Sequence, residues 1–570
     1  MHEQSFMKSL FHGVIDEGTL FPFPEPSREE ADSTNQLVET VRRYFEKNVD
    51  SKQIDLDEKI PDQVLTGLKA LGVFGMAIPK AHGGGGMSHT AFARVMEEFG
   101  ALDSSIAVTV GAHQSIGLEG ILLFGTEAQK AKYLPKLATG EHVASFALTE
   151  PGAGSDAAAI QTRAEKRGDR YILNGSKIWI TNGAFADVFT VFARTSSSED
   201  GAKPRLTAFI VERGKGLTSG RHEKKLGIRG ASTTEVFFDN VEVPEANVLG
   251  EVGRGFKVAM EVLNNGRIAL ASGCVGACKR LIRLGVERAE ERKAFGRSIG
   301  EFGLIKDKIA EMMSETYALE SMTYLTTGLV DRNVRDYSVE SAICKVFGSE
   351  TLWRVANETL QIAAGTGYMC DYPYERCLRD ARINLIFEGT NEILRCFIAL
   401  SGMQGPGEAL NEVSKAMREP IKGFGLLSDF AFRKAKSALG RERIVRAHPI
   451  LSRESVVLDE LTHDLVRNVD KVLRRHGRNI AEMQFTQKRV ADMAIDLFAI
   501  ASVISRTSRA IELRGEEGAR REIALSHVFV NRAEKRLRDT VTSFDKNDDE
   551  LRKSIAAKAY NDGGYPLDIL

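Results

Sequence analysis

The stretch RYILNGSKIWITNG, residues 170–183, decides how the chain is organised, because helical periodicity stops before it and returns only well after it. It predicts a strand, a turn and a second strand, since the Asn174-Gly175 pair favours a two-residue hairpin turn. The segments ADVFTVFART, RLTAFIVERG and TEVFFDNVEVP follow as further short strands separated by Gly, Lys and Ser. Residues 143–252 are therefore expected to form a β domain.

Helical periodicity lies on both sides of this β domain. VETVRRYFEK and VLTGLKALGVFG precede it with apolar residues at i, i+3 and i+4, and a long pattern beginning FKVAMEVLNNGRIALASG follows it. The expected fold class is α+β and mostly α, with a central β-barrel or sandwich. The expected divisions are an irregular leader at 1–35, an N-terminal helical domain at 36–142, the β domain at 143–252, a C-terminal helical bundle at 253–400, a Gly- and Pro-containing linker at 401–412 and an extra helical domain at 413–570.

The composition is that of a soluble globular enzyme, with 570 residues, 43% apolar and 27% charged. The formal net charge of -1 gives no support to a nucleic-acid partner. Six scattered cysteines are not a disulfide framework, and the histidines form no metal-spaced pair, so no metal site is expected. Cys274 and Cys278 lie one helical turn apart and are expected to be small buried residues rather than ligands.

The sequence also bears on targeting and on membrane binding. No apolar run reaches the length of about 20 residues that a membrane span needs. The first residues, MHEQSFMKSLFHGVIDEGTLFPFPEPS, have neither a secretory hydrophobic core nor an Arg-rich transit composition, so we expect a cytoplasmic protein or the removal of a targeting segment. Residues 421–446 interleave apolar and basic residues, which suits an anionic membrane surface, although a solvated helix or loop has the same composition.

Two segments of the β domain have the composition of a ligand site. FALTEPGAGSD, residues 146–156, is a turn in which glycines allow close backbone approach while Thr149 and Ser155 offer hydroxyl groups. This suits a phosphate or the edge of a heteroaromatic ring, and an ordinary Pro-Gly turn is the alternative. WITNG, residues 179–183, places Trp179 where it lies against a flat cofactor or packs in the core.

Two further segments stand beside predicted helices. QIAAGTGY, residues 361–368, offers small residues for contact with a ligand or a neighbouring subunit, and a helix C-cap is the alternative. NLIFEGTNEILR, residues 384–395, places Glu388 directly behind an apolar run, where a charge is costly unless it is paired or performs a task. Glu388 is either a base in a dry pocket or a loop residue, with Thr390 or Asn391 capping the following helix.

These four motifs, together with a fifth, ERKAFGR at residues 291–297, resemble the acyl-CoA dehydrogenase family. FALTEPGAGSD, WITNG, ERKAFGR, QIAAGTGY and FEGTNEILR occur in the order and approximate spacing of that family, over about residues 40–400. The extension to residue 570, with GAHQSIG, NNGR and VFGSE, resembles the very-long-chain branch, including its paralogue that assembles respiratory complex I. The resemblance implies FAD as cofactor and α,β-dehydrogenation of long-chain acyl-CoA to trans-2-enoyl-CoA, the first step of fatty acid β-oxidation.

The resemblance also implies roles for individual residues. Glu388 would be the catalytic base, because Gly266 occupies the position at which some relatives carry it instead. The FAD-binding residues would be Phe146, Leu148, Thr149, Gly154, Ser155, Trp179, Ile180, Thr181, Arg292, Gln361, Gly365, Thr390, Asn391 and Glu392. The substrate-binding residues would be Ser155, Asn264, Arg267 and Gly389. The family usually has two adjacent glycines where this chain has Ala364-Gly365, so we expect the Ala364 methyl group to crowd the cofactor.

Substrate length, partners and compartment follow less directly. Gly111, Ala112, Gly117 and Gly120 remove bulk from a helix that lines the acyl pocket in the family, which favours a long acyl chain, although small residues also serve tight helix packing. The resemblance implies electron transfer to electron-transferring flavoprotein, a homodimer and peripheral membrane association. We expect a cytoplasmic protein, peripheral at the inner membrane, if the source is bacterial, and a mitochondrial one if the chain is a processed eukaryotic protein. The alternatives are an acyl-CoA oxidase and a respiratory-complex assembly scaffold with residual activity.

Overall fold

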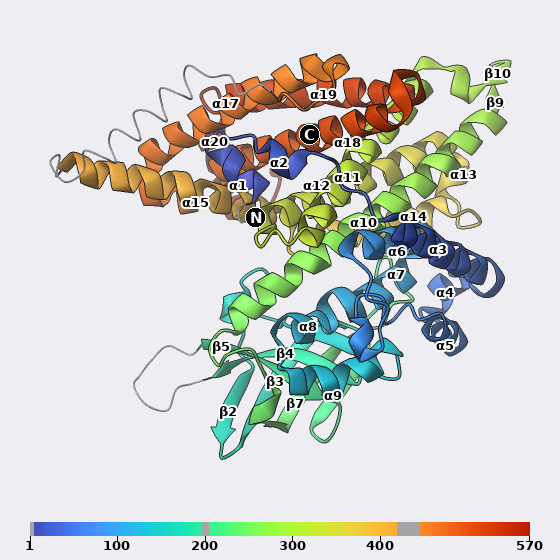
Figure 1. Ribbon diagram of the computed structural model, residues 1–570, viewed down its shortest axis with the longest axis vertical. Coiled ribbons are helices and arrows are strands. Elements are labelled where there is room, and N and C mark those ends of the chain that lie inside the picture. Colours follow the sequence, from blue (N-terminus) through green and yellow to red (C-terminus); the bar gives the residue numbers. More distant parts are fainter. Residues whose placement is uncertain (1–4, 196–204, 419–443, 570) are drawn as a thin grey trace.

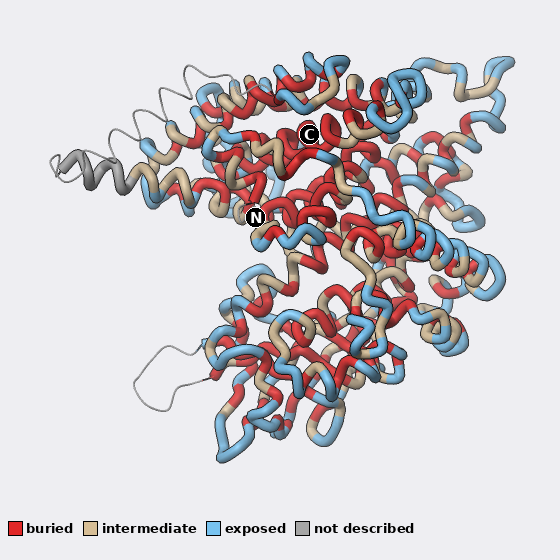
Figure 2. The backbone as a smooth tube through the Cα atoms, in the orientation of Figure 1, coloured by how far each residue is buried: buried red, intermediate tan, exposed pale blue. Residues whose placement is uncertain are grey.

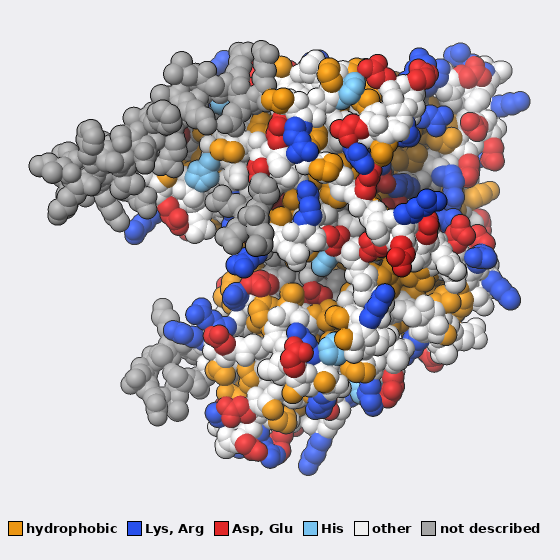
Figure 3. Space-filling view, in the orientation of Figure 1, with side chains coloured by type: hydrophobic (Ala, Val, Ile, Leu, Met, Phe, Trp, Pro, Cys, Tyr) orange, Lys and Arg blue, Asp and Glu red, His pale blue; other side chains and the backbone are white. Residues whose placement is uncertain are grey.

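The computed structural model describes residues 5–195, 205–418 and 444–569, and the side chains of all these except residues 411–418. It has the expected α+β architecture, in which a β domain and a block of helices flank a central helical bundle (Figure 1). On the face shown in Figure 3, acidic and basic side chains are interspersed, in keeping with the near-neutral net charge. The site described below lies where the central bundle meets the N-terminal helices and the β domain.

The N-terminal part is helical and packs around its own apolar cluster, which includes Phe45, Phe74 and Phe99. The helices are α3 (Arg28–Asn48), α4 (Ser51–Asp57), α5 (Asp62–Ala70), α6 (His89–Leu102), α7 (Ser104–Gly111), α8 (Glu119–Phe124) and α9 (Glu127–Ala138). Between α7 and α8 the chain forms a short π-helix, η2 (Ala112–Gly117). Such π-helical turns widen a helix locally and are frequent at functional sites.

The β domain is one eight-stranded sheet in the order β6-β7-β3-β2-β4-β5-β8, with β1 paired to β4 in parallel. The strands are β1 (Ala144–Ala147), β2 (Arg163–Arg167), β3 (Arg170–Thr181), β4 (Val188–Thr195), β5 (Arg205–Glu212), β6 (Leu217–His222), β7 (Thr233–Pro244) and β8 (Val248–Leu249). Apolar clusters lie on both faces of β4, so its residues are buried almost throughout.

The expected hairpin at Asn174-Gly175 is wrong. Strand β3 runs unbroken through this pair, and the register against β7 shifts there as in a β-bulge. Gly175 has φ +147°, and an added Cβ would lie 2.6 Å from the Thr162 hydroxyl oxygen, so the residue permits a bulge and a close strand contact. The tight turn between β2 and β3 is formed instead at Gly168, with φ +63°.

The central bundle is built on three long helices, α10 (Gly255–Glu291), α11 (Gly303–Asp331) and α12 (Ser338–Ala363). A small hairpin of β9 (Lys293–Ala294) and β10 (Arg297–Ser298) leaves the end of α10. The shorter elements α13 (Gly365–Tyr368), α14 (Tyr374–Arg382), η6 (Ile383–Leu385) and α15 (Asn391–Arg418) follow. The predicted linker at 401–412 is wrong, because these residues continue α15 through Pro406.

Two of the three glycines that suggested a linker, Gly402 and Gly405, make room for the N-terminal segment. An added Cβ at Gly402 would lie 2.3 Å from the ring of Phe11, which comes from α1 (Phe6–Phe11). The predicted irregular leader at 1–35 is therefore also wrong, since it contains α1, α2 (Glu17–Leu20) and the start of α3. Phe6, Met7 and Leu10 are buried, because together they cover an apolar surface formed by later helices.

The extra helices are α17 (Ser452–His476), α18 (Gln484–Gly518), α19 (Arg520–Ser543) and α20 (Asp549–Asp562). Helices α17, α18 and α19 share one apolar cluster with α10, α11, α12 and α1, so the buried core runs without a break from the bundle into this region (Figure 2), whereas α20 has no buried residue. Residues 421–443, most of the segment considered for membrane binding, lie outside the described residues.

One segment is more apolar than expected. Ser104–Phe124 has the length and composition of a membrane span, with a mean hydropathy of 1.3. However, 72% of that window is buried inside the protein, where it packs against α10, α6 and the sheet. Its apolar character is therefore explained as that of a core helix.

Because α1 docks through its apolar face, replacing Phe11 with Ala should destabilise the protein. We expect the free energy of unfolding to fall by about 3–5 kcal/mol, the usual effect of truncating a buried Phe. Urea unfolding followed by circular dichroism measures this. Val14→Ala is the control, because Val14 is 45% exposed and should change stability by less than about 0.5 kcal/mol. If Phe11→Ala lowered the free energy of unfolding no more than Val14→Ala, the docking of α1 would not stabilise the fold.

Candidate active site

A cavity of about 110 Å³ lies between α6, α7, η2 and α10, and it ends at the loop that follows η6. Its lining is mostly apolar, and small residues on α7, η2 and α10 keep it open. These small residues are Ala107, Gly111, Ala112, Gly266, Ala269, Gly273 and Ala277. Its polar lining residues are Ser104, Ser115, Thr181, Asp380, Asn384 and Glu388. An apolar cavity with few polar groups is the usual form of a small-molecule site.

Glu388 stands in a turn whose backbone is unusual. Its φ is +59°, and that of Gly389 is +95°, so two consecutive residues adopt left-handed conformations. Such a conformation is costly for a non-glycine residue and is found where function requires it. Thr390 then caps α15 by accepting a hydrogen bond from the Ile393 N–H at 3.4 Å. The turn directs the Glu388 side chain to the cavity, while Gly389 absorbs the sharpest part of the bend.

The environment of the Glu388 carboxylate is largely dry. Its Oε2 atom is buried and accepts no hydrogen bond from any residue that the structure describes. Burial raises the pKa of the Glu388 carboxyl group to about 7, although the charges of Arg267 and Lys345 oppose this shift. A carboxyl group with this pKa can take up a proton near neutral pH, as a general base must.

Two buried cations hold the backbone of this turn. Arg267 Nε donates to the carbonyl oxygen of Glu388 at 3.2 Å, and Lys345 Nζ donates to that of Gly389 at 2.7 Å. Burial lowers the pKa of Lys345 to about 8, with Glu388 opposing the effect. Both cations thus fix the turn through main-chain oxygens and leave the carboxylate free.

Gly266 lies directly beside the Glu388 carboxylate. An added Cβ there would lie 2.8 Å from Glu388 Oε2 and 2.7 Å from a methyl carbon of Ile116. The position expected to carry the base in some relatives therefore lies next to Glu388 in space, and glycine leaves the room that Glu388 needs. Asn264, another expected substrate residue, accepts a hydrogen bond from Arg267 Nη1 at 3.1 Å.

A second group of expected residues lies at the C-terminal ends of β1 and β3. Phe146 and Leu148 lead from β1 into the turn that carries Thr149, Gly154 and Ser155, and the last two are exposed. Among the described residues, nothing lies within 4 Å of a Cβ added at Gly154, so a ligand can approach the backbone there. The turn is therefore open to a flat or phosphate-bearing molecule.

A buried ion pair that was not expected from the sequence supports this turn. Lys177, fully buried, donates to the carbonyl oxygen of Leu148 at 2.9 Å and to Glu150 at 2.8 Å. Glu150 in turn accepts from the main-chain N–H groups of Gln161 and Thr162. Lys177 and Glu150 are 27 positions apart, and only the alternation of buried residues in β3 could have suggested an inward lysine.

Trp179 and Thr181 follow at a second irregularity of β3. Trp179 has φ +59° and is 62% exposed, which is unusual for so large a ring, while Ile180 beside it is buried. The strained backbone turns the indole outward beside Thr181 on the cavity wall. An exposed ring and open glycines in one place fit a flat cofactor such as FAD.

Other expected cofactor residues lie apart from Glu388. Arg292 lies at the end of α10 beside the β9–β10 hairpin, and Gln361 and Gly365 flank the start of α13; all three are exposed. Ala364 has φ +53° and ψ -134°, a conformation that suits glycine far better than alanine. The methyl group at this position thus strains the backbone as well as adding bulk.

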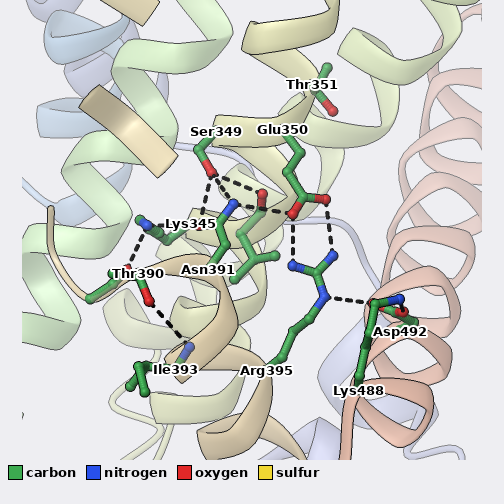
Figure 4. Close-up of polar contacts among 12 residues, drawn as sticks. Lys345, Ser349, Glu350, Thr351, Thr390, Asn391, Ile393, Arg395, Lys488 and Asp492 are labelled. Atoms are coloured by element: carbon green, nitrogen blue, oxygen red, sulfur yellow. Dashed lines mark hydrogen bonds and ion pairs between the residues drawn. The ribbon is translucent and has the colours of Figure 1, made fainter. Parts of the chain in front are cut away.

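The residues after Glu388 divide into exposed and buried ones. Glu392 is exposed, whereas the Asn391 side chain is buried and bonds to Lys345, Ser349 and Glu350 (Figure 4). Asn391 therefore organises the loop from behind rather than facing the cavity.

Of the four small residues expected to line an acyl pocket, two line the cavity and two do not. Gly111 and Ala112 line the cavity. Gly117 and Gly120 do not, since an added Cβ would meet Ala144 at 2.9 Å and Leu249 at 2.9 Å respectively. These two serve close packing against the sheet.

Comparison with known proteins shows which proteins this chain resembles. Family models match in order the acyl-CoA dehydrogenase N-terminal domain (31–141), middle domain (145–241) and C-terminal domain (253–403), and then the ACAD9/ACADV C-terminal domain (449–565). The mitochondrial very long-chain specific acyl-CoA dehydrogenase of Macaca fascicularis is 43% identical over 579 residues, covering 98% of this chain and 88% of that protein.

Solved structures are also similar to this chain. The acyl-CoA dehydrogenase from Bacillus anthracis, complexed with FAD, superposes with a TM-score of 0.80 and 32% identity, covering 98% of this chain and 96% of that one. A chain from a structure described as the electron transferring flavoprotein of Acidaminococcus fermentans gives a TM-score of 0.62 and 36% identity, covering 66% of this chain and 98% of that one.

The electrostatics of Glu388 lead to a prediction on its titration. Infrared spectra of wild type minus those of Glu388→Gln should isolate the band of the protonated Glu388 carboxyl group. As the pH is raised, this band should disappear with a midpoint at about pH 7. Replacing Lys345 with Met removes a positive charge that favours the ionised form, so the midpoint should move to higher pH. An unchanged midpoint in Lys345→Met, or a wild-type midpoint near the ordinary value for Glu of about 4.3, would contradict the dry environment and the effect of the lysine charge.

Proposed function

The chain belongs to the acyl-CoA dehydrogenase family, and from this premise we propose that Glu388 removes the Cα proton of a long-chain acyl-CoA. The protein is an oxidoreductase that catalyses FAD-dependent dehydrogenation of acyl-CoA in fatty acid β-oxidation. The observation that carries the assignment of the base is a carboxylate in a dry cavity, with a pKa of about 7 and no hydrogen bond to its Oε2 from the described residues.

The residues around Glu388 perform three tasks. The apolar lining excludes water, so the carboxylate is poorly solvated and is a stronger base toward a weakly acidic C–H group. Arg267 and Lys345 hold the turn by its carbonyl oxygens, which keeps the carboxylate in one position. None of the described residues accepts a hydrogen bond from the Glu388 N–H, so this group is available to stabilise the thioester oxygen as the proton leaves.

The residues at the C-terminal ends of β1 and β3 would hold the cofactor. Thr149, Ser155, Trp179 and Thr181 offer hydroxyl groups and an exposed ring around an open backbone. Bound there, FAD supplies the two-electron acceptor that no amino-acid side chain provides. The Lys177–Glu150 pair ties β3 to the turn that carries Thr149 and Ser155.

The form of the cavity supports a long acyl chain. The part of α10 that lines it runs from Gly266 to Ala277, which corresponds to about 16 Å along the helix axis. Every α10 residue on this wall is small or apolar. A chain entering at Glu388 can therefore extend well past the reacting carbons.

The exposed surface and the related proteins suggest a second copy of the chain and an electron acceptor as partners. Phe295 is 94% exposed, Leu304 80% and Tyr368 75%, and these residues belong to the neighbouring β9–β10, α11 and α13 region at one side of the molecule (Figure 1). We propose that these residues take part in a homodimer interface, which would cover their apolar surface. Electron-transferring flavoprotein is the proposed electron acceptor. We place the protein in the cytoplasm, peripheral at the inner membrane, or in the mitochondrion if it is eukaryotic.

The assignment of the base is tested by anaerobic mixing with palmitoyl-CoA while the flavin absorbance is recorded. Wild type should bleach rapidly, whereas Glu388→Gln should bleach at least about 10³-fold more slowly, because the substitution removes the only proposed proton acceptor. Unchanged flavin content in the variant shows that the site is intact. Equal bleaching rates would refute the role of Glu388, and no bleaching of wild type by any acyl-CoA would refute the activity.

The assignment of the acyl pocket is tested by narrowing it. A Cβ added at Gly273 meets nothing within 4 Å among the described residues, so a leucine there would project into the cavity. We expect Gly273→Leu to raise KM for palmitoyl-CoA about tenfold or more and to shift the preference to shorter chains. Gly285→Ala is the control, since it lies on the same helix away from the cavity and makes ordinary contacts. An unaltered chain-length profile in Gly273→Leu would contradict the assignment.

A further inference from the structure

A polar contact joins the extra helices to the bundle close to the active site. Asp492 of α18 accepts a hydrogen bond from Arg395 Nε at 2.7 Å (Figure 4). The two other nitrogens of the same guanidinium bind both oxygens of Glu350 on α12, at 2.7 and 3.0 Å. Arg395 is thus held by carboxylates from two other helices, and the bidentate pair with Glu350 fixes its orientation.

The contacts continue from Glu350 to the catalytic turn. Glu350 Oε1 accepts a second hydrogen bond, from Asn391 Nδ2 at 3.2 Å. Asn391 Oδ1 accepts from Lys345 Nζ at 2.8 Å, and the same ammonium group donates to the carbonyl oxygen of Gly389 at 2.7 Å. An unbroken line of hydrogen bonds therefore runs from α18 to the residue next to Glu388.

We propose that Asp492 is a positioning residue for Glu388, so that the extra C-terminal helices complete the support of the catalytic turn. Without Asp492, Arg395 would keep only Glu350 as a partner, so the Arg395–Glu350 pair would lose its anchor on α18 and could shift as a unit. Asn391 bonds to Glu350 as well as to Ser349, so a shift of this pair would reach Asn391 and, through it, Lys345. The Gly389 carbonyl would then be held less firmly, and the Glu388 carboxylate would occupy a wider range of positions.

An alternative is that this ion pair only attaches α18 to α15. The apolar cluster already does so, since Leu394 and Ile398 of α15 lie in the same cluster as Val490, Ala494 and Leu497 of α18. A partly buried ion pair adds little stability to such an interface, because removing the charges from water is costly. Its contribution is instead to fix geometry at its inner end, where the line reaches the turn.

The same helix carries a matched control one turn further on. Asp496 bonds to Arg536 of α19 at 2.7 and 3.1 Å, and Arg536 also bonds to Glu315 of α11. Each aspartate therefore pairs with an arginine that keeps a glutamate partner when the aspartate is removed. Of these two ion-pair groups, only that of Asp492 is connected to the catalytic turn by the contacts that the structure describes.

The experiment uses the full-length, FAD-loaded protein with Asp492→Ala, Asp492→Asn and Asp496→Ala. Because Asp492 acts on the position of the base, Asp492→Ala should lower the limiting rate of flavin reduction by palmitoyl-CoA about five- to tenfold, with little change in half-saturation. Asp492→Asn, which retains an acceptor for Arg395, should fall between this variant and wild type. Asp496→Ala should leave the rate within about twofold of wild type.

A second measurement does not depend on activity. Amide hydrogen exchange of residues 383–391 should be faster in Asp492→Ala than in wild type or Asp496→Ala, because the turn loses support. In a Lys345→Met background, the effect of Asp492→Ala on the rate should disappear, since the line is already broken.

Three results would overturn the proposal: equal losses of rate in the two alanine variants, unchanged exchange at residues 383–391, or full additivity with Lys345→Met. The proposal rests on the proposed role of Glu388, but the two fail separately. If wild type is not reduced by acyl-CoA, the proposed function fails, while the exchange experiment still shows whether Asp492 supports the turn.

Discussion

The site depends on keeping the Glu388 carboxylate near positive charge without bonding it directly. Arg267 and Lys345 lie close enough to oppose the rise in its pKa, yet their hydrogen bonds to the turn go to main-chain carbonyl oxygens. A direct ion pair would stabilise the charged form and lower the pKa, which would make a weaker base. Without the cations, burial alone would keep the carboxyl group protonated. The arrangement provides a base that is both ionisable and reactive near neutral pH.

This arrangement needs exceptions to ordinary backbone and helix preferences. Glu388 and Gly389 adopt left-handed conformations, and Gly266 lies within the long helix α10, where glycine has a lower helix propensity than alanine. These costs are offset by the packing of α10 and α12, which are buried along most of their length. A rigid scaffold with local strain at the reacting group is the expected distribution of stability in an enzyme.

Much of this could be predicted from sequence, and the failures have physical causes. The change of period marked the β domain, and the charge behind an apolar run marked Glu388. Short helices such as α1 carry too few residues for a period to show, and the glycines at 402 and 405 favoured a linker because their packing against α1 involves residues about 390 positions away. The Lys177–Glu150 pair was missed for the same reason, since nothing local identifies which charged residue in a strand faces inward.

Helix α12 shows how remote parts of the chain act together. Glu340, five positions before Lys345, is fully buried and accepts hydrogen bonds from Ser5 Oγ and the Met7 N–H at the N-terminus. Glu350, five positions after Lys345, is held by Arg395. The N-terminal segment and, through Arg395, helix α18 therefore fix α12 on both sides of the lysine that holds the catalytic turn. Because an ammonium group on a long, flexible side chain positions a carbonyl only as well as its own backbone is fixed, these outer segments belong to the machinery of the site.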